Sequence, residues 1–140
     1  MRPDSAGPGT PEDWLRHARS HLALAVAVGP VGDVLAETLC YHAQQAAEKA
    51  LKAVLINVGV EFPRTHSLRL LVDLLPPTLR TKSVLESAVA LTDYAVTARY
   101  PGEIEPISQL ELEESIRIAR GVVSWAESKV CGSPSRALPP

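Results

Sequence analysis

A stripe of apolar residues between positions 35 and 58 constrains the fold of this chain more than any other feature. Apolar side chains recur there at spacings of three and four residues, as one face of an α-helix requires: Leu35, Leu39, Ala43, Ala46, Ala50, Val54 and Val58. Asp33 is a candidate N-cap, and Gly59 follows the last apolar position. A helix over 33–59 would be roughly 40 Å long at about 1.5 Å per residue. The stripe therefore predicts the central helix of a bundle.

Capping residues, prolines and glycines mark further helical segments, and no alternating strand pattern lies between them. The first helix should begin at Thr10, an N-cap followed by Pro11 at the first helical position, and should end before Gly29. A short helix should cover 66–75, because two prolines follow it and cannot continue it. Another helix should run from about 81 to 98.

The last helix has the clearest start signal, because Ser108 and Glu111 have the spacing of a capping box. Its apolar residues follow a strict four-three alternation: Leu112, Ile116, Ala119, Val123, Ala126 and Val130. Such a seam can pack inside one bundle or across a dimer.

These segments predict an all-α fold, an up-and-down antiparallel four-helix bundle with an additional short helix. A chain of 140 residues is expected to form one domain, here residues 10–131. Residues 1–9 and 132–140 are rich in proline, serine and glycine and are expected to be disordered.

Composition narrows the class of protein. The net charge is −2 and no cluster of Lys and Arg appears, so a duplex-binding surface is not predicted. The longest apolar run, 22–28, is far shorter than the roughly 20 residues of a membrane span. No signal peptide is evident, and Cys40 and Cys131 lack metal-type spacing. We therefore expect a soluble cytoplasmic protein with reduced thiols and no membrane partner.

Polar residues on the long helix form a candidate binding strip. Two adjacent groups lie at three-and-four spacing: Tyr41, Gln45, Glu48 and Lys52, and His42, Gln45 and Lys49. Such a strip can hydrogen-bond a base, a ribose or a partner. The alternative is a solvated face in which Glu48 and Lys52 form an ion pair worth about 0.3–0.5 kcal/mol. Spacing alone favours the solvated face, because polar helix faces usually contact water.

A second candidate site lies near the end of the helix over 81–98. Arg99 is next to Tyr100 and close to Tyr94, and a guanidinium beside aromatic rings suits a phosphate and a stacked base. The alternative is that Arg99 caps the last carbonyls of its helix. Glu103 and Glu105 follow closely and would repel a polyanion.

The remaining histidines do not indicate catalysis. His17 and His21 are four residues apart, but the HARSH sequence lacks the glutamate of a zinc HExxH motif, so no metal site is predicted. His66, with Thr65 or Ser67 as the helix cap, is expected to make a structural hydrogen bond. No nucleophile motif or glycine-rich phosphate loop is present, and no cofactor is predicted.

The segment CYHAQQAAEKALKAVL at 40–55, together with ARYPGE at 98–103, resembles the HEPN domain, and the resemblance spans roughly 14–130. The resemblance implies an α-helical bundle that is usually a homodimer. It also implies a small prokaryotic protein often encoded beside a minimal nucleotidyltransferase, in some cases as a toxin–antitoxin pair. Many such domains are metal-independent ribonucleases with an arginine followed, after four to six residues, by a histidine.

Arg99 matches that arginine, but Ile104, Glu105 and Pro106 occupy the positions of the histidine. The sequence motif YxxxxRYP at 94–101 makes nucleotide or single-stranded RNA binding a better inference than RNA cleavage. The resemblance assigns the binding site to these residues: His42, Gln45, Glu48, Lys49, Lys52, His66, Tyr94, Arg99 and Tyr100. Two alternatives remain. One is an RNA endonuclease toxin that uses Arg99 with Glu105 or a histidine elsewhere, and the other is a non-catalytic helical adaptor.

Overall fold

The computed structural model describes residues 9–28, 32–80, 83–95 and 107–130, with the backbone alone for 28 and 91–95. These residues form helices and no strand, which confirms the predicted all-α class. The elements are α1 (Pro11–Val28), α2 (Ala36–Asn57), α3 (Leu68–Leu74), the 3-10 turn η1 (Pro77–Leu79), α4 (Ser83–Ala95) and α5 (Gln109–Val130).

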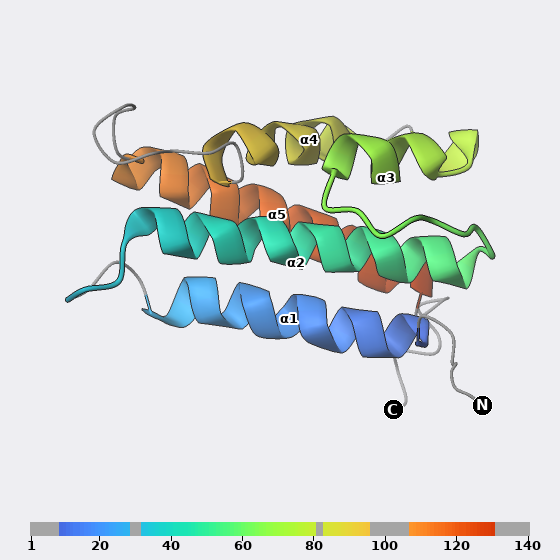
Figure 1. Ribbon diagram of the computed structural model, residues 1–140, viewed down its shortest axis with the longest axis horizontal. Coiled ribbons are helices and arrows are strands. Elements are labelled where there is room, and N and C mark those ends of the chain that lie inside the picture. The colour runs from blue at the N-terminus through green and yellow to red at the C-terminus, as the bar shows by residue number, and fades with distance from the viewer. Residues whose placement is uncertain (1–8, 29–31, 81–82, 96–106, 131–140) are drawn as a thin grey trace.

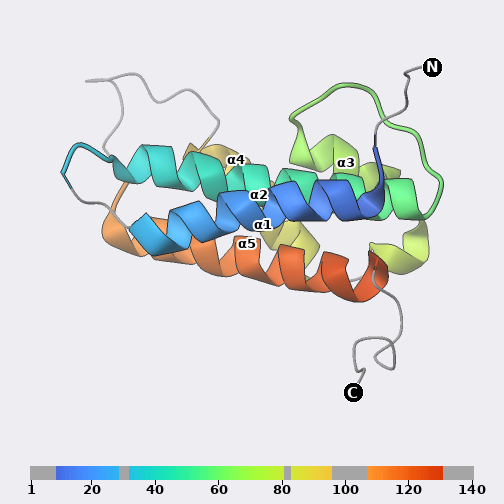
Figure 2. The same cartoon turned by 90° about the horizontal axis from the view of Figure 1, so that it is seen from below.

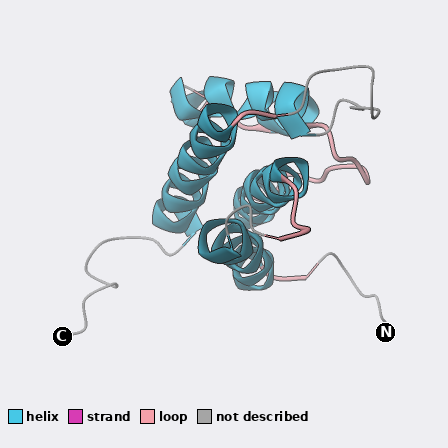
Figure 3. Ribbon diagram, turned by 90° about the vertical axis from the view of Figure 1, so that its left-hand side faces the viewer, coloured by secondary structure: helices cyan, strands magenta, loops and turns pink. Residues whose placement is uncertain are grey.

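Helix α2 is the axis of the bundle, as its apolar stripe predicts. It contacts α1, α3, α4 and α5, and its contact with α1 is the most extensive in the fold. Figure 1 shows α1 and α2 side by side and antiparallel, with α5 behind them. Seen from below, α1 crosses in front of α2 and α5 lies beside the pair (Figure 2). In Figure 3, which views the molecule from the left-hand side of Figure 1, α3 and α4 lie along the top of the other helices.

Local capping interactions fix the helix starts that the sequence predicts. The Asp13 backbone N–H donates to the Thr10 hydroxyl over 3.0 Å, and the Thr10 N–H donates back to the Asp13 carboxylate over 3.2 Å. The Ser108–Glu111 capping box closes reciprocally at 2.9 and 3.1 Å. Ser67 caps α3 by accepting from the Leu70 N–H over 3.1 Å.

One predicted helix start is wrong. Helix α2 begins at Ala36, and its N-cap is the extended residue Leu35, without a capping side chain, rather than Asp33. Tertiary contacts set this start: Val34 and Ala36 pack against a small apolar cluster, and the Glu37 carboxylate accepts from the Ile107 N–H over 3.1 Å. Helix α4 is described from Ser83 to Ala95, within the predicted range, and the predicted residues 81–82 and 96–98 lie outside the described part.

The predicted apolar stripes build the core. Ala43, Ala46, Ala50 and Val54 of α2 are fully buried, in one cluster with the α5 seam residues: Ala119, Val123 and Ala126. The α5 seam therefore packs inside the chain's own bundle. Gly121 lies where α4 and α5 approach closely, because a Cβ there would come within 2.8 Å of the Val84 Cγ2 atom. Cys40 is buried, with its Sγ atom 3.6 Å from the Ser115 hydroxyl.

Within the described residues, no helix combines the length and apolar character that a bilayer span requires.

Candidate functional site

The polar strip of α2 is buried, so the solvated-face alternative is wrong. Gln44, Gln45, Glu48 and Lys52 are all buried, and the Glu48 side chain is 0% exposed. Tyr41 is different, since it remains 45% exposed. Polar side chains that fold into the interior must find partners there, because an unpaired charge in such a place is very costly.

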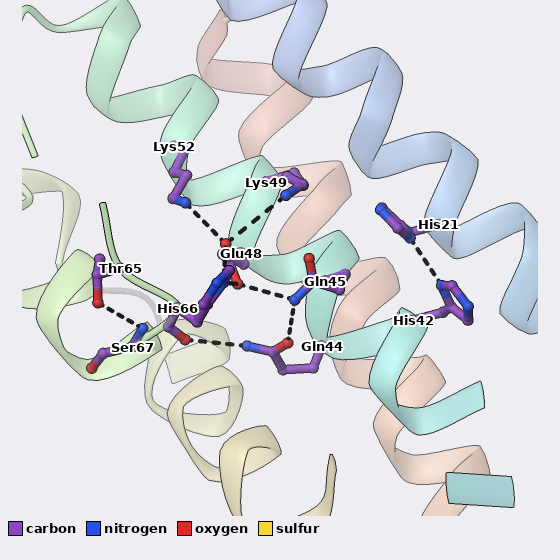
Figure 4. A network of polar contacts seen from close by, with 10 residues as sticks. All are labelled: His21, His42, Gln44, Gln45, Glu48, Lys49, Lys52, Thr65, His66 and Ser67. Carbon is purple, nitrogen blue, oxygen red and sulfur yellow. Dashed lines mark hydrogen bonds and ion pairs between the residues drawn. The ribbon is translucent and has the colours of Figure 1, made fainter. Parts of the chain in front are cut away.

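The buried side chains converge on the Glu48 carboxylate, as Figure 4 shows. It accepts hydrogen bonds from Lys52 Nζ at 2.9 Å and from Gln45 Nε2 at 3.2 Å. His66 Nδ1 lies 3.1 Å from both carboxylate oxygens. Gln45 also donates to Gln44 Oε1 over 3.0 Å. We call these five residues the Glu48 cluster: Gln44, Gln45, Glu48, Lys52 and His66.

His66 connects the Glu48 cluster to solvent. Its side chain is 73% exposed, although its Nδ1 atom contacts a carboxylate that is 0% exposed. Its backbone carbonyl accepts from Gln44 Nε2 over 3.4 Å, which ties the segment before α3 to α2. Because an ionised carboxylate only accepts hydrogen bonds, Nδ1 carries the proton. In the neutral imidazole, Nε2 is then left as an acceptor for a ligand. The predicted structural hydrogen bond of His66 is present, and its partner is Glu48.

Two aromatic rings hold the lysines of this site. Lys52 Nζ lies 5.4 Å from the centre of the Trp14 ring and 5.7 Å from that of Phe62. Lys49 Nζ lies 5.6 Å from the centre of the Trp14 ring and 4.0 Å from Glu48. The two rings meet edge to face, with centroids 6.3 Å apart. Cation–π attraction at these distances restricts where the ammonium groups can lie.

Three residues of this site are not predicted from sequence patterns: Gln44, Trp14 and Phe62. Gln44 lies next to a predicted member of the strip, and its burial could not be read from spacing. Trp14 precedes the buried core residue Leu15 on α1, and Phe62 lies in the connection after α2. Nothing in the local pattern connects these rings with Lys52; their contact depends on the packing of three separate segments.

His42 does not join the Glu48 cluster. Its Nδ1 atom lies 3.0 Å from Nδ1 of His21 on α1, with the rings stacked at 5.2 Å between centroids and 25° between planes. Burial lowers the pKa of His21 below its usual value, and the positive charges of His42, Lys49 and His17 lower it further. His21 thus contacts His42 on α2, whereas His17, one turn earlier on α1, is exposed.

The charges around Glu48 leave a positive surplus. One carboxylate faces the ammonium groups of Lys49 and Lys52 and the imidazole of His66. Such a surplus favours an anionic ligand, for example a phosphate. Among the residues described, no set of three or more His, Cys, Asp or Glu side chains is arranged around a metal ion.

Three predicted site residues cannot be placed relative to this cluster. Arg99 and Tyr100 lie outside the described residues, and so do Glu103 and Glu105. Tyr94 lies on α4, whose last turn is described by its backbone alone. The structure therefore brings together Gln45, Glu48, Lys49, Lys52 and His66 from the predicted set.

Comparisons with known proteins agree with this fold. A family model described as "HEPN domain" matches residues 11–129. The structure is similar to the crystal structure of TT1696 from Thermus thermophilus, at 32% identity and a TM-score of 0.72, covering 85% of this chain and 97% of that one. It is also similar to ST0689, an archaeal HEPN homologue, at 28% identity and a TM-score of 0.66, covering 87% and 98%. A search of curated proteins finds no match.

Proposed function

Since the chain belongs to the HEPN domain family, we propose that it binds a nucleotide or a single-stranded nucleic acid beside the Glu48 cluster. The observation that carries this proposal is the burial of the Glu48–Lys52 ion pair, with its positive surplus, inside an otherwise alanine-rich helix. A buried ion pair is weak evidence for stabilisation, because desolvation of both charges offsets their attraction. Buried charges with a route to solvent are, by contrast, typical of functional sites.

The partly exposed members are the groups proposed to touch the ligand. Lys49 keeps 20% of its side chain exposed, and His66 is mostly exposed, so both can reach a phosphate while Glu48 and Lys52 stay inside. We assign Arg99 to a phosphate and Tyr100 or Tyr94 to stacking on a base, the roles that these side chains suit chemically. His42 completes the proposed set beside His21.

The proposed biological setting is a homodimer that acts with a minimal nucleotidyltransferase, as in a toxin–antitoxin pair. Its support is the HEPN domain membership alone. The adaptor alternative makes a different prediction. The protein would then pull down the neighbouring gene product even when Arg99 is replaced and no nucleotide binds.

Binding should weaken when a proposed phosphate contact is removed. We expect Arg99→Ala and Lys49→Ala each to weaken binding of ATP or a short single-stranded RNA at least tenfold, about 1.4 kcal/mol. Each should also reduce the salt dependence of RNA binding by roughly one phosphate contact. Calorimetry at several salt concentrations measures both quantities.

The matched control is Arg117→Ala, because Arg117 lies on the surface of α5 in an ion pair with Glu114. This variant should bind like the wild type. An Arg99→Ala protein that binds both ligands as tightly as wild type would refute the assignment of Arg99 to the site.

The contact between Glu48 and His66 favours a second candidate function, RNA cleavage. A carboxylate on Nδ1 leaves Nε2 in position to take a proton from a ribose 2′-hydroxyl, which is how a carboxylate–histidine pair acts as a general base. The 2′-oxygen would attack the adjacent phosphorus, and the 5′-oxygen would leave with a proton from solvent. His66 would then be the histidine that positions 104–106 lack.

The primary proposal expects RNA bound by the wild type to remain intact, because the family's arginine–histidine spacing is absent from the sequence. Gel analysis of end-labelled RNA tests this expectation. Cleavage to a 2′,3′-cyclic phosphate, lost in His66→Ala and restored by added imidazole, would replace binding with catalysis as the function.

A further inference from the structure

The carboxyl end of α2 carries a cavity of about 400 Å³ next to the aromatic rings of the Glu48 cluster. Its lining residues are Ile56, Gly59, Val60, Glu61 and Phe62. We propose that this cavity is a base subsite that selects guanine in single-stranded RNA. The subsite depends on the proposed function and deepens it, because it specifies which base accompanies the phosphate bound beside the Glu48 cluster.

The chain forms the cavity by turning back at the end of α2. The Gly59 N–H donates to the Ile56 carbonyl over 3.1 Å. The Val60 N–H donates to the Leu55 carbonyl over 2.9 Å, which completes a Schellman motif. Gly59 has a φ angle of +78°, the left-handed conformation that this motif requires. In Figure 1 the connection that follows runs back along α2 to α3. Local hydrogen bonds therefore hold the wall of the cavity in place before a ligand binds.

Phe62 belongs both to the cavity and to the surroundings of the Glu48 cluster. Its ring centre lies 5.7 Å from Lys52 Nζ, and its ring meets the Trp14 ring edge to face. The Trp14 ring in turn lies 5.6 Å from Nζ of Lys49, the proposed phosphate contact. Lys49 and Ile56 are two helical turns apart on one face of α2, or roughly 10 Å at about 1.5 Å per residue. A base in the cavity can therefore direct its phosphate towards Lys49.

The lining of the cavity suits a planar base. Pockets for small ligands typically have volumes of about 300–1,000 Å³, mostly apolar walls and a few polar groups that fix orientation. Here Phe62 and aliphatic side chains supply the apolar wall, and Glu61 supplies the one charged group. Glu61 is exposed, and its carboxylate has no ion-pair or hydrogen-bond partner within the described part of the chain. Its oxygens are therefore available to a ligand.

The carboxylate of Glu61 determines which base is preferred. An ionised carboxylate only accepts hydrogen bonds, so it favours a base edge that carries donors. Guanine offers two adjacent donors, N1–H and the N2 amino group, which match the two oxygens. Adenine and uracil each place an acceptor beside their donor, and that acceptor would face a lone pair. The negative end of the α2 dipole adds to the preference for donors.

The same negative charge keeps phosphate out of the cavity, so the phosphate stays at Lys49. The base proposed to stack on Tyr94 or Tyr100 then belongs to a neighbouring nucleotide of the same RNA.

The test is calorimetry of the full-length protein with a uridine hexamer and with the same hexamer carrying one guanosine, adenosine or inosine. We expect the guanosine RNA to bind at least tenfold more tightly than the uridine and adenosine RNAs, as a bidentate contact to a base can provide. Inosine lacks the N2 amino group and should bind with intermediate affinity. Glu61→Gln should lose the guanosine preference, because an amide offers only one acceptor, and should bind the uridine RNA as the wild type does.

Glu113→Gln is the matched control, because Glu113 is an exposed carboxylate on α5, and it should keep the guanosine preference. Urea unfolding of both variants checks that they remain folded. Binding of the uridine RNA without a guanosine preference, or with a preference that Glu61→Gln retains, would overturn the guanine subsite and leave the proposed function standing. Failure of the wild type to bind any of these RNAs would instead refute RNA binding, and the subsite with it.

Discussion

Replacing Glu48 with alanine is expected to lower the free energy of unfolding by about 3–5 kcal/mol, one of the largest effects that a single substitution can have in this chain. The Glu48 side chain is 0% exposed and is the only described carboxylate that contacts the buried Lys52 ammonium group. Its removal leaves that ammonium buried beside the Trp14 and Phe62 rings, where cation–π attraction alone cannot replace the ion pair. Gln45 and His66 lose their acceptor as well.

Glu86→Ala is the matched control for this stability measurement. Glu86 also pairs with a cation, Arg69, but its side chain is 62% exposed, so its loss should cost less than about 1 kcal/mol. Urea unfolding followed by circular dichroism gives both values. A Glu48→Ala protein within about 1 kcal/mol of wild type would mean that Lys52 reaches water easily and that the Glu48 cluster is not a locked arrangement.

The sequence predicts those features of the structure that depend on interactions between residues close together in the chain, namely the helix caps and the apolar helix faces. The Thr10–Asp13 and Ser108–Glu111 caps form within four residues, so their spacing alone identifies them. The apolar stripes are also local in character, because the helical period fixes which side chains share a face. The start of α2 was mispredicted because contacts with a distant segment, including the Ile107 N–H, determine it.

The sequence predicted which residues of α2 share the polar face of the candidate site, but it did not predict that they are buried. The period of α2 placed Gln45, Glu48 and Lys52 on one face, yet spacing favoured a solvated face for them. Their burial depends on Trp14 from α1 and on the connection that carries Phe62 and His66. Likewise, sequence distance paired His21 with His17, whereas the packing of two helices pairs it with His42.

The second large effect is expected from replacing the whole buried pair, in the double variant Glu48→Leu with Lys52→Met. Apolar residues of similar volume in place of a buried ion pair are commonly neutral or stabilising, by up to about 1–4 kcal/mol. A methionine at 52 would also contact the two aromatic rings favourably. We therefore expect a stable, folded protein whose net charge is unchanged and whose binding of nucleotide or RNA is lost.

This double variant separates function from stability. The single Glu48→Ala change should destabilise the fold, whereas the double replacement should not, although both remove the carboxylate that positions His66 and Lys52. The matched control is Glu114→Leu with Arg117→Met, an equally charge-neutral change of a surface pair on α5. That control should bind as the wild type does.

The most direct test of a ligand site at the Glu48 cluster is calorimetry of the wild type, the Glu48→Leu/Lys52→Met variant and its α5 control against the same short single-stranded RNA. We predict saturable binding by the wild type and the control, and at least a tenfold loss in a double variant that unfolds at the same or a higher urea concentration. Equal binding by all three proteins, or no binding by the wild type, would contradict the account and leave the buried ion pair a structural feature of α2.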